Sequence, residues 1–402
     1  MKVRIENSLL KGKISVPSSK SIGHRAFIAS FLSCKKNTVF FKGISQDTIS
    51  TLQCLIKLGC VFKMMGDRIE FIDTRLPIGH RFHVRESAST IRFLLPLTTY
   101  YFKEVVFITA GHLINRPLTE YEKYYSVTKD YLNNEIHVKS LSKRINEFEI
   151  NGDESSQFIT GLLFYLTKKR CGKVKVLGEI KSRPYVDLTL DVLNDYGVEI
   201  EEKDNEFIIK DVNFKSEDFY VEGDWSLAAN YIVYNRLINE ERIFIDNLKI
   251  DSIQGDSIIS SLLDDIDNGK TISLKHTPDL GPILFVYAAV KNNETTFIDF
   301  ERLRIKESNR IESMEEELNK AGITFDYVDN KLIVKGKKEH KGDYTFYAHN
   351  DHRIAMALSM YSLINNGTCE IVDAECVKKS YVEFFNDLIK LGANIQIDLF
   401  VE

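Results

Sequence analysis

The chain has 402 residues, of which 44% are hydrophobic, and its formal net charge at pH 7 is −5. This length predicts two or three domains with ordinary hydrophobic cores, and the mild acidity argues against a nucleic-acid partner. The segment Met1–Glu6 has no apolar signal core, and the longest apolar stretch, near 280–290, is too short to span a membrane. We therefore expect a cytoplasmic protein with no nucleic-acid or membrane partner. We also expect a monomer, although the sequence does not determine the oligomeric state.

Motifs for metal ions and nucleotide cofactors do not occur in the sequence. The cysteines form no CxxC pair and have no histidines at metal-ligand spacing, so we expect reduced, buried side chains rather than a zinc site or disulfides. No glycine-rich phosphate loop follows an expected strand. We predict that the protein uses no metal and no cofactor. The six cysteines are Cys34, Cys54, Cys60, Cys171, Cys369 and Cys376.

One local pattern recurs along the chain: an apolar-periodic helix, a residue suited to the left-handed position after the helix, and an alternating strand. The clearest copies have this residue at Gly59, Gly197, Gly322 and Gly392. Polar turns predict that a second strand returns after the first three, at Gly66-Asp67, Asp204-Asn205 and Asp329-Asn330. Weaker copies at Asn134 and Gly269 complete six units of similar size.

A single unit of this kind cannot bury its helix, whereas three units can pack their helices inward and leave their sheets outside. The series therefore predicts two domains of three units each. The polar segment 215–222 is the expected division between them.

Four short runs combine lysine or arginine with hydroxyl, amide and carboxyl groups, in a chain whose net charge gives no general reason for such clusters. They predict sites for a small anion such as a phosphate or a carboxylate. Each run alone could instead be the solvated face of a helix. The runs are 17–25, Ser155-Ser156-Gln157, 304–310 and Asn350-Asp351-His352-Arg353.

With these runs and the repeat, the chain resembles the 5-enolpyruvylshikimate-3-phosphate synthase family over essentially its whole length. The family's opening Lys-Ser and its nearby arginine match Lys20, Ser21 and Arg25. Further matches are 86–90 with Arg92, Arg116-Pro117, Ser155-Ser156-Gln157, 182–187, Pro278-Asp279, 306–310, 350–353 and 376–380.

The resemblance implies a two-domain, inside-out α/β barrel of the enolpyruvyl transferase type, with three βαβαββ units in each domain. It places the N-terminal domain at 16–221 and the C-terminal domain at 1–15 and 222–402, with hinges near 16 and 222 and closure over substrate. The implied reaction transfers the enolpyruvyl group of phosphoenolpyruvate to the 5-hydroxyl of shikimate 3-phosphate and releases phosphate.

The resemblance also implies roles for single residues. Asp279 would be the base for the hydroxyl, Glu307 would act near the methylene carbon, and Lys20 would be an acid toward the bridging oxygen. His352 could orient a neighbour or take part in the chemistry. From its local sequence, Asp279 after Pro278 could instead cap the expected apolar helix 280–290. Groups for phosphoenolpyruvate would be Lys20, Ala88, Arg116, Gln157, Arg310, Arg353 and Lys379; groups for shikimate 3-phosphate would be Lys20, Ser21, Arg25, Ser155, Ser156, Gln157, Ser182, Tyr185, Asp279 and Lys306.

Some residues depart from the family pattern. Ala88 stands where a glycine is usual, which suggests tolerance of the family's herbicide inhibitor glyphosate, because a methyl group narrows the pocket. Ser18 replaces a common glycine, Val382 a common proline, and Arg302 an asparagine found in some members.

Two other functions remain possible at this point. One is a UDP-N-acetylglucosamine enolpyruvyl transferase, although the segment 109–116 lacks the cysteine typical of that enzyme. The other is a non-catalytic anion-binding relative. Retention of both Asp279 and Glu307 disfavours the latter, because a binding relic has no use for the two acids together.

Overall fold

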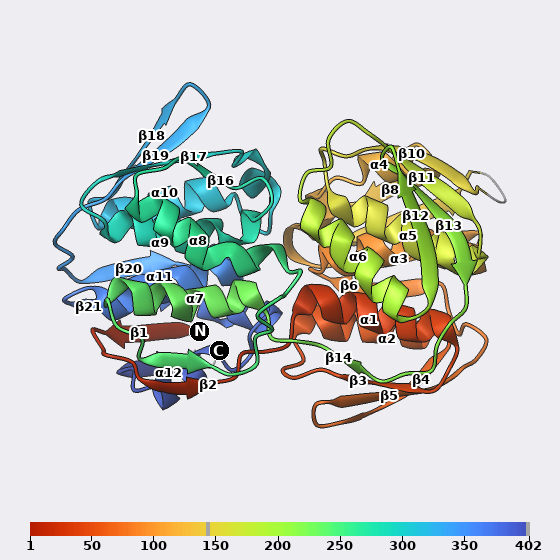
Figure 1. Cartoon of the computed structure of the whole chain (residues 1–402), viewed down its shortest axis with the longest axis horizontal. Coiled ribbons are helices and arrows are strands. Elements are labelled where there is room, and N and C mark those ends of the chain that lie inside the picture. Colours follow the sequence, from red (N-terminus) through yellow and green to blue (C-terminus); the bar gives the residue numbers. More distant parts are fainter. Residues whose placement is uncertain (142–144, 399–402) are drawn as a thin grey trace. The chain divides into compact units, whose positions relative to one another are not determined.

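The computed structural model describes residues 1–141 and 145–398 and separates the chain into two units. Unit A consists of 1–17 together with the chain from 222 onward, and unit B of 18–221. The chain thus passes from one unit to the other after Pro17 and after Val221, the first crossing lying two residues later than a boundary before Val16. In Figure 1, unit B runs from red through orange to yellow-green.

The described residues of unit B, 18–141 and 145–221, form three four-stranded sheets with one plan. In each, the first two strands are parallel, and a β-hairpin pairs antiparallel with the second strand. In hydrogen-bonded order, the sheets are β14 (Phe219–Tyr220), β3 (Asn37–Phe40), β5 (Arg68–Thr74) and β4 (Cys60–Met65); β6 (Arg81–Arg85), β7 (Glu104–Thr109), β9 (Glu135–Ser140) and β8 (Tyr125–Asp130); and β10 (Glu147–Asn151), β11 (Gly172–Leu177), β13 (Glu206–Val212) and β12 (Val198–Lys203).

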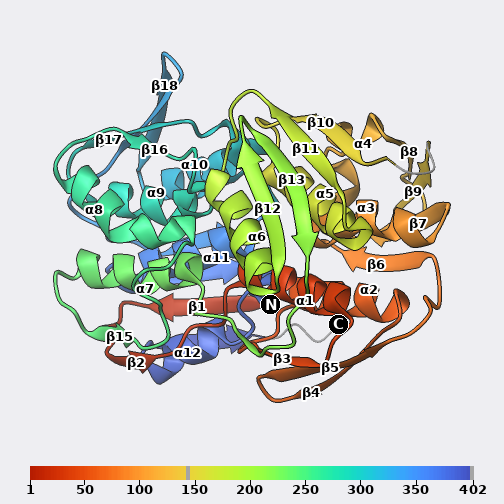
Figure 2. The same cartoon turned by 45° about the vertical axis from the view of Figure 1, so that its right-hand side comes forward.

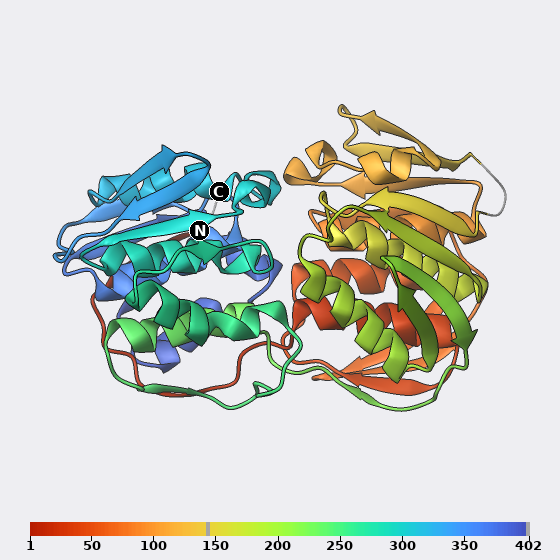
Figure 3. The ribbon, with the colours of Figure 1, turned by 45° about the horizontal axis from the view of Figure 1, so that its top comes forward.

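The helices of unit B lie at its centre and the sheets lie outside, as Figure 3 shows. Three of the helices, α1, α3 and α5, are buried along most of their length and share one hydrophobic core. This arrangement confirms the inside-out packing. The helices are α1 (Lys20–Ser33), α2 (Gln46–Lys57), α3 (Ala88–Tyr101), α4 (Thr119–Glu122), α5 (Ser156–Lys169) and α6 (Arg183–Asp195), with a 3₁₀ turn η1 (Gly111–Asn115).

Unit A repeats this plan less completely. Its described residues, 1–17 and 222–398, form two four-stranded sheets and one two-stranded sheet. The sheets are β20 (Tyr344–Tyr347), β21 (Thr368–Val372), β1 (Lys2–Glu6) and β22 (Ile395–Asp398); β16 (Ile272–Ser273), β17 (Glu294–Ile298), β19 (Lys331–Lys335) and β18 (Thr324–Val328); and β15 (Ile243–Ile245) with β2 (Gly12–Ile14).

The most buried helices of unit A are α7, α9 and α11, which pack on one another in a second hydrophobic core. The shorter α8 contacts α7 and α9, and Figure 2 shows α12 near β2. The α-helices are α7 (Trp225–Leu237), α8 (Ile259–Asp267), α9 (Gly281–Val290), α10 (Arg310–Lys320), α11 (His352–Ile364) and α12 (Phe384–Lys390). The 3₁₀ turns are η2 (Gly255–Ile258), η3 (Pro278–Leu280), η4 (Glu301–Ile305) and η5 (Ala374–Lys379).

The clearest copies of the repeat are confirmed. Gly59, Gly197, Gly322 and Gly392 each follow a helix with positive φ. At Gly59 the requirement is also steric, because an added Cβ would lie 2.1 Å from the carbonyl oxygen of Arg75, where the hairpin returns. The hairpin turns also lie where the sequence predicts them, and Asp204-Asn205 and Asp329-Asn330 have positive φ at both residues.

The prediction for the two weaker copies of the repeat, at Asn134 and Gly269, is wrong in part. Asn134 does not end a helix but lies in the turn between β8 and β9, because a left-handed asparagine suits a hairpin turn as well as a helix end. Gly269 does follow α8, but no hairpin comes after it: β16 pairs in parallel with β17 and begins the next sheet. The repeat that contains β2 and β15 therefore has a sheet of two strands.

Two of the repeats contain a strand that comes from a distant part of the chain. β14 provides the first strand of the sheet that contains β3, and β1 lies between β21 and β22, where the last hairpin would otherwise have its returning strand. Local sequence does not reveal either exchange, because each strand pairs with residues remote in the chain.

Two expectations from composition can be compared with the structure directly. Cys34 and Cys171 are exposed, contrary to the expectation of buried cysteines, whereas the other four are buried. Within residues 1–141 and 145–398, no helix has the length and apolarity needed to cross a membrane.

A close approach between α3 and α5 depends on Gly161. A Cβ there would lie 2.1 Å from the Arg92 carbonyl oxygen and 2.2 Å from the Tyr121 hydroxyl oxygen. We expect Gly161→Ala to destabilise the protein by about 1–3 kcal/mol from overpacking, more than the roughly 1 kcal/mol that alanine gains over glycine inside a helix. Urea unfolding would measure this. Gly79→Ala, where a Cβ has only one neighbour, at 4.0 Å, should be nearly neutral.

Candidate active site

The cation-rich runs lie at the N-terminal ends of helices in both units. Ser19, Ser87 and Ser155 cap α1, α3 and α5, and their hydroxyls accept hydrogen bonds from backbone N–H groups of the first turn. Asn309 and Asp351 cap α10 and α11 in the same way. The N-terminal end of a helix carries partial positive charge, so this placement adds to the attraction of the side chains for anions.

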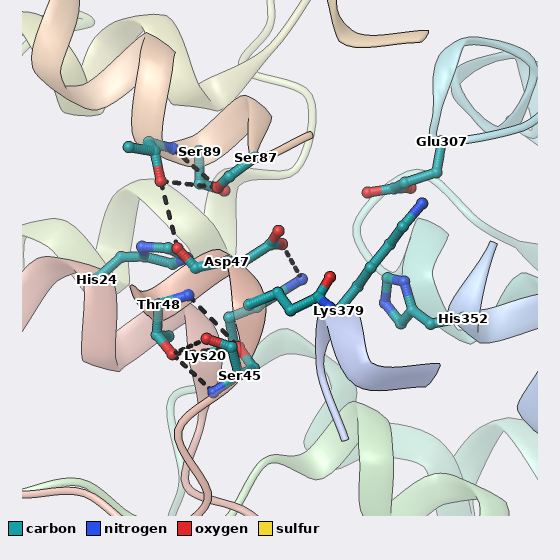
Figure 4. A network of polar contacts seen from close by, with 12 residues as sticks. Lys20, His24, Ser45, Asp47, Thr48, Ser87, Ser89, Glu307, His352 and Lys379 are labelled. Atoms are coloured by element: carbon teal, nitrogen blue, oxygen red, sulfur yellow. Dashed lines mark hydrogen bonds and ion pairs between the residues drawn. The ribbon is translucent and has the colours of Figure 1, made fainter. Parts of the chain in front are cut away.

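Lys20 lies in the first turn of α1 and forms an ion pair with Asp47, with 2.9 Å between Nζ and Oδ2 (Figure 4). Asp47 lies in the first turn of α2, which begins with a capping box formed by Ser45 and Thr48. Both charged side chains are about 15% exposed, so they remain reachable by a ligand. The ion pair holds the ammonium group at the start of α1.

Arg25 points into unit B and is 2% exposed. Its guanidinium donates to Thr189 Oγ1 at 2.8 Å and to the carbonyl oxygens of Ser21 and Tyr185 at 2.5 and 2.8 Å. It also lies 5.0 Å from the centre of the Phe93 ring. Burial lowers the pKa of Arg25 to about 9, which still leaves it charged at neutral pH. Arg25 thus joins α1 to α6, and its direct contact with a substrate stays a prediction.

Gln157 is held in a fixed orientation by two neighbours on α3. Arg92 Nη1 donates to Gln157 Oε1 at 2.9 Å, and Gln157 Nε2 donates to Ser89 Oγ at 3.0 Å. Arg92 also donates to the carbonyl oxygen of Pro117 at 2.8 Å. Because Pro117 follows Arg116, this network ties the loop of Arg116 to the start of α5.

The other predicted residues of unit B also lie at or next to helix starts. Ala88 is the first residue of α3 and is 6% exposed. Ser156 begins α5 and is buried. Ser182 precedes α6 in a left-handed conformation with φ of 55°, and Tyr185 lies in that helix's first turn. Arg116 is the exception, because it follows the 3₁₀ turn η1.

In unit A, three cations converge on one carboxylate. Asp279 Oδ1 accepts from Lys306 Nζ at 3.2 Å and from Arg310 Nη1 at 2.8 Å, and its Oδ2 accepts from Arg353 Nη2 at 2.9 Å. The sequence left open whether Asp279 caps the following helix. It does not, because α9 has no side-chain cap and the Asp279 carboxylate binds these cations instead.

Arg310 connects three carboxylates although it is only 1% exposed. Besides Asp279, it donates to Glu307 Oε2 at 2.7 Å and to Asp351 Oδ2 at 2.8 Å. The Asp351 carboxylate is fully buried and also caps α11 by accepting from the Arg353 N–H at 2.9 Å. One guanidinium therefore holds both candidate acids and the start of α11 together.

The charges in this cluster change two pKa values. Burial disfavours the Asp279 carboxylate, but Arg353, Lys306 and Arg310 outweigh it and hold the pKa of Asp279 well below its usual range. Burial lowers the pKa of Lys306 to about 8, although Asp279 acts in the opposite direction. At neutral pH this pKa leaves Lys306 mostly charged.

Three more predicted residues lie beside this cluster or near it. Arg353 also donates to Ser226 Oγ, at 3.1 Å, at the start of α7. Lys379 ends η5 and donates to the carbonyl oxygen of Asn350 at 2.5 Å, just before Asp351. His352 is the first residue of α11 and is 1% exposed. Figure 4 shows His352, Lys379 and Glu307 as sticks.

Not every charged residue of the runs belongs to the cluster. Arg304 is 39% exposed and pairs with Glu312 at 3.2 Å, so it belongs to the solvated surface. The charge of Arg302 acts on Lys306 and lowers its pKa. Arg302 thus lies near the cluster from η4, in the position where the sequence departs from some relatives.

Sequence reasoning did not assign a role to Asp47, Ser226 or Asp256. Asp47 and Ser226 are ordinary first-turn residues of α2 and α7, and nothing in their local sequence indicates that Lys20 and Arg353 bind them. Asp256 lies in η2, outside the cation-rich runs. Only the spatial arrangement brings these residues to the cations.

Among the described residues, one group has the composition of a metal site: Glu316, Glu317 and His349. The buried Glu317 carboxylate already accepts from Lys320 at 2.6 Å, from the Tyr347 N–H at 2.8 Å and from His349 at 2.9 Å. These contacts join α10 to the loop before α11, so we assign the group a structural role.

The fold of this chain is that of solved enolpyruvyl transferases. Solved structures of this class cover the chain. An EPSP synthase from Acinetobacter baumannii aligns with 98% of this chain and 100% of its own at TM-score 0.76 and 20% identity. The enolpyruvyl transferase NikO from Streptomyces tendae aligns over 98% of both chains at TM-score 0.70 and 13% identity.

Sequence comparison is more specific. The family model described as EPSP synthase (3-phosphoshikimate 1-carboxyvinyltransferase) matches residues 5–388. Curated relatives named 3-phosphoshikimate 1-carboxyvinyltransferase include one from Clostridioides difficile, 35% identical over 98% of each chain, and one from Clostridium perfringens, 35% identical over 97% of this chain and 98% of its own. The chain belongs to the EPSP synthase family.

Proposed function

We propose that the residues gathered in units A and B are the groups with which this chain performs its family's reaction. That reaction transfers the enolpyruvyl group of phosphoenolpyruvate to the 5-hydroxyl of shikimate 3-phosphate and releases phosphate. The observation that carries the assignment is the Asp279 carboxylate bound by Lys306, Arg310 and Arg353, with Glu307 on the same arginine. Candidate acids and anion-binding cations are thereby combined in one cluster.

The arginines of unit A suit the anionic groups of phosphoenolpyruvate. A guanidinium donates two parallel hydrogen bonds to a carboxylate or phosphate, which gives both affinity and orientation. In our proposal Arg310 and Arg353 bind the donor from unit A, while Lys20, Gln157 and Arg116 act from unit B. Lys379, held against Asn350, provides a further cation for its phosphate.

Shikimate 3-phosphate is assigned mainly to unit B. The hydroxyls of Ser155, Ser156 and Ser182 stand at the starts of α5 and α6, where backbone N–H groups and the helix dipole also favour a phosphate. Ser21, Arg25 and Tyr185 lie at the adjoining start of α1 and α6. Lys306 and Asp279 are assigned to the ring hydroxyls of the same molecule.

Binding of the donor gives Asp279 the basicity that a base needs. With three cations on its carboxylate, its pKa is too low for efficient proton abstraction at neutral pH. When the anionic groups of phosphoenolpyruvate bind Arg310 and Arg353, they reduce the positive charge acting on Asp279 and raise its pKa. Asp279 then takes the proton of the 5-hydroxyl of shikimate 3-phosphate, while the oxygen of this hydroxyl attacks the enolpyruvyl group of the donor.

The other proton steps follow from position and charge. The donor's methylene carbon must gain a proton during the addition and lose one when phosphate leaves, which restores the enol double bond. Glu307, held by Arg310, is the group assigned to both transfers. Lys20 donates toward the bridging oxygen as phosphate leaves, and its ion pair with Asp47 orients it for this step.

A phosphate-release assay tests the function. Purified protein is mixed with phosphoenolpyruvate and either shikimate 3-phosphate or UDP-N-acetylglucosamine. We expect inorganic phosphate and an enolpyruvyl product only with shikimate 3-phosphate. Release only with the nucleotide sugar would assign the chain to the related transferase, and release with neither would support a binding protein without catalysis.

Ala88 gives a prediction on inhibitor selectivity. Its methyl group is buried at the start of α3, and the next residue, Ser89, binds Gln157. Glyphosate is longer than phosphoenolpyruvate, so a narrowed pocket should penalise it by ~1–3 kcal/mol, or roughly ten- to hundredfold in affinity. We expect Ala88→Gly to lower the glyphosate inhibition constant by that factor while the KM for phosphoenolpyruvate changes little. Equal inhibition constants for the two proteins would contradict this.

A further inference from the structure

Asp256 is a buried carboxylic acid that the roles assigned above do not use. It lies in η2, is 6% exposed, and packs beside the start of α7. Gln254 fixes this position: its Nε2 donates to the Gly223 carbonyl oxygen at 2.9 Å, and its Oε1 accepts from the Trp225 N–H at 3.2 Å. The acid is thus held rigidly next to the end of α7 where Ser226 binds Arg353.

The Asp256 carboxyl differs from its neighbours in its hydrogen bonding. Within residues 1–141 and 145–398, its buried Oδ1 has no hydrogen-bond partner. By contrast, Asp224 accepts from the N–H groups of Ser226 and Leu227, and Asp279 accepts from three cations. A buried carboxylate oxygen without a donor makes ionisation costly, and protonation of the acid reduces this cost.

The groups that act on Asp256 electrostatically belong mainly to the active-site cluster. They are Asp279, Arg353, Asp224 and Lys306. The helix α8, which follows η2, carries acids at its C-terminal end, where they pair with cations of their own: Asp264 with Arg236, Asp265 with Lys270 and Asp267 with Lys291.

The charges of the cluster explain why Asp256 has no cation of its own. The cations Lys306, Arg310 and Arg353 are matched by Asp279, Glu307 and Asp351. Burial, followed by the charge of Asp279, raises the pKa of Asp256 to about 7. Any further anion at these arginines adds negative charge near Asp256 and favours its protonated form.

We propose that Asp256 is a positioning residue that takes up one proton when the anionic groups of phosphoenolpyruvate bind at Arg310 and Arg353. The proton comes from solvent, adds to a carboxylate oxygen, and returns to solvent when phosphate leaves; no other bond changes at Asp256. Binding of phosphoenolpyruvate is thereby coupled to protonation of Asp256, and an ionised Asp256 opposes this binding. The inference rests on the proposed function.

The test compares wild type with Asp256→Asn, which imitates the neutral acid in shape. We would measure kcat and kcat/KM for phosphoenolpyruvate at saturating shikimate 3-phosphate from pH 6 to 8.5. The value of kcat/KM reports ionisations of the enzyme before the donor binds, and titration of the substrate itself cancels in the ratio of the two proteins. We expect the ratio of kcat/KM, variant to wild type, to rise about tenfold across this range. The ratio of kcat should change far less.

The control is Asp251→Asn, an exposed acid five residues earlier, whose ratio to wild type should not depend on pH. A constant kcat/KM ratio for Asp256→Asn would overturn the inference. Inactivity of the wild type would instead refute the proposed function, so the two failures are distinct.

Thermal unfolding gives a second readout that does not need activity. Because folding raises the pKa of Asp256, its ionisation penalises the folded state increasingly between pH 4 and 7, and the penalty remains at higher pH. We therefore expect the melting temperature of Asp256→Asn, relative to wild type, to rise between pH 5 and pH 8. If this relative melting temperature does not rise, the inference is also contradicted. The unfolding test can be carried out even if the variant has lost its turnover.

Discussion

Asp279→Asn is expected to lower kcat by at least ~100-fold, because asparagine cannot take the proton of the 5-hydroxyl. The affinity for shikimate 3-phosphate should stay within roughly tenfold, since the amide keeps the shape and part of the hydrogen bonding. Glu307→Gln should lower kcat by a similar factor through loss of the other proton transfer. Single-turnover kinetics and calorimetric titration separate the two effects. If either variant kept a turnover number near that of the wild type, the catalytic role assigned to that residue would be wrong.

The same substitution at Asp279 should also change stability, because it leaves three cations without their common carboxylate. Breaking a fully buried ion pair costs about 3–5 kcal/mol, and Asp279 should cost less because its side chain is 17% exposed. Folding depresses the pKa of Asp279, so the stabilisation exists above its unfolded-state pKa and is lost as pH falls through its lower folded-state value. The stability difference between wild type and variant should therefore shrink below about pH 4.

Arg310→Lys should raise the KM for phosphoenolpyruvate by ~100-fold or more, which corresponds to about 2.7 kcal/mol. Lysine keeps the charge but cannot bind Asp279, Glu307 and Asp351 at once, as the planar guanidinium does. We also expect a stability loss of several kcal/mol, about 3–5 for a broken buried pair. Steady-state kinetics with urea unfolding would measure both.

Arg304→Lys is the matched control for Arg310→Lys. Arg304 lies six residues earlier, is 39% exposed, and pairs only with Glu312 among the ion pairs described. An exposed pair of this kind contributes about 0–1 kcal/mol, so neither KM nor stability should change appreciably. If Arg310→Lys behaved like this control, the central role of Arg310 in the cluster would be refuted.

The sequence by itself determined the features that depend on local chemistry. Glycine after a helix indicated the left-handed turns at Gly59 and Gly197, and aspartate and asparagine pairs indicated the hairpins, because these residues adopt positive φ at low cost. The spacing of serine, lysine and arginine indicated the anion-binding runs. Family membership followed from those runs, since they match a family pattern along the whole chain.

Local chemistry did not resolve cases in which one signal fits two structures. Asn134 suited a helix end and a hairpin turn equally, and Asp279 suited a helix cap and an active-site acid equally. Strand exchange was also invisible: β1 completes a sheet with residues more than three hundred positions away. Such choices depend on which groups pack together, and chain neighbours do not determine this.

Only the tertiary structure decided the electrostatics of the candidate site. The composition of the run 304–310 does not distinguish Arg304 from Arg310, yet the first is exposed to solvent and the second is buried among three carboxylates. The sequence also treats Asp256 as an ordinary acid, whereas burial near Asp279 raises its pKa, and the cations around Asp279 lower the pKa of that neighbour. A pKa depends on desolvation and on charges a few ångströms away, and folding brings both from distant parts of the chain.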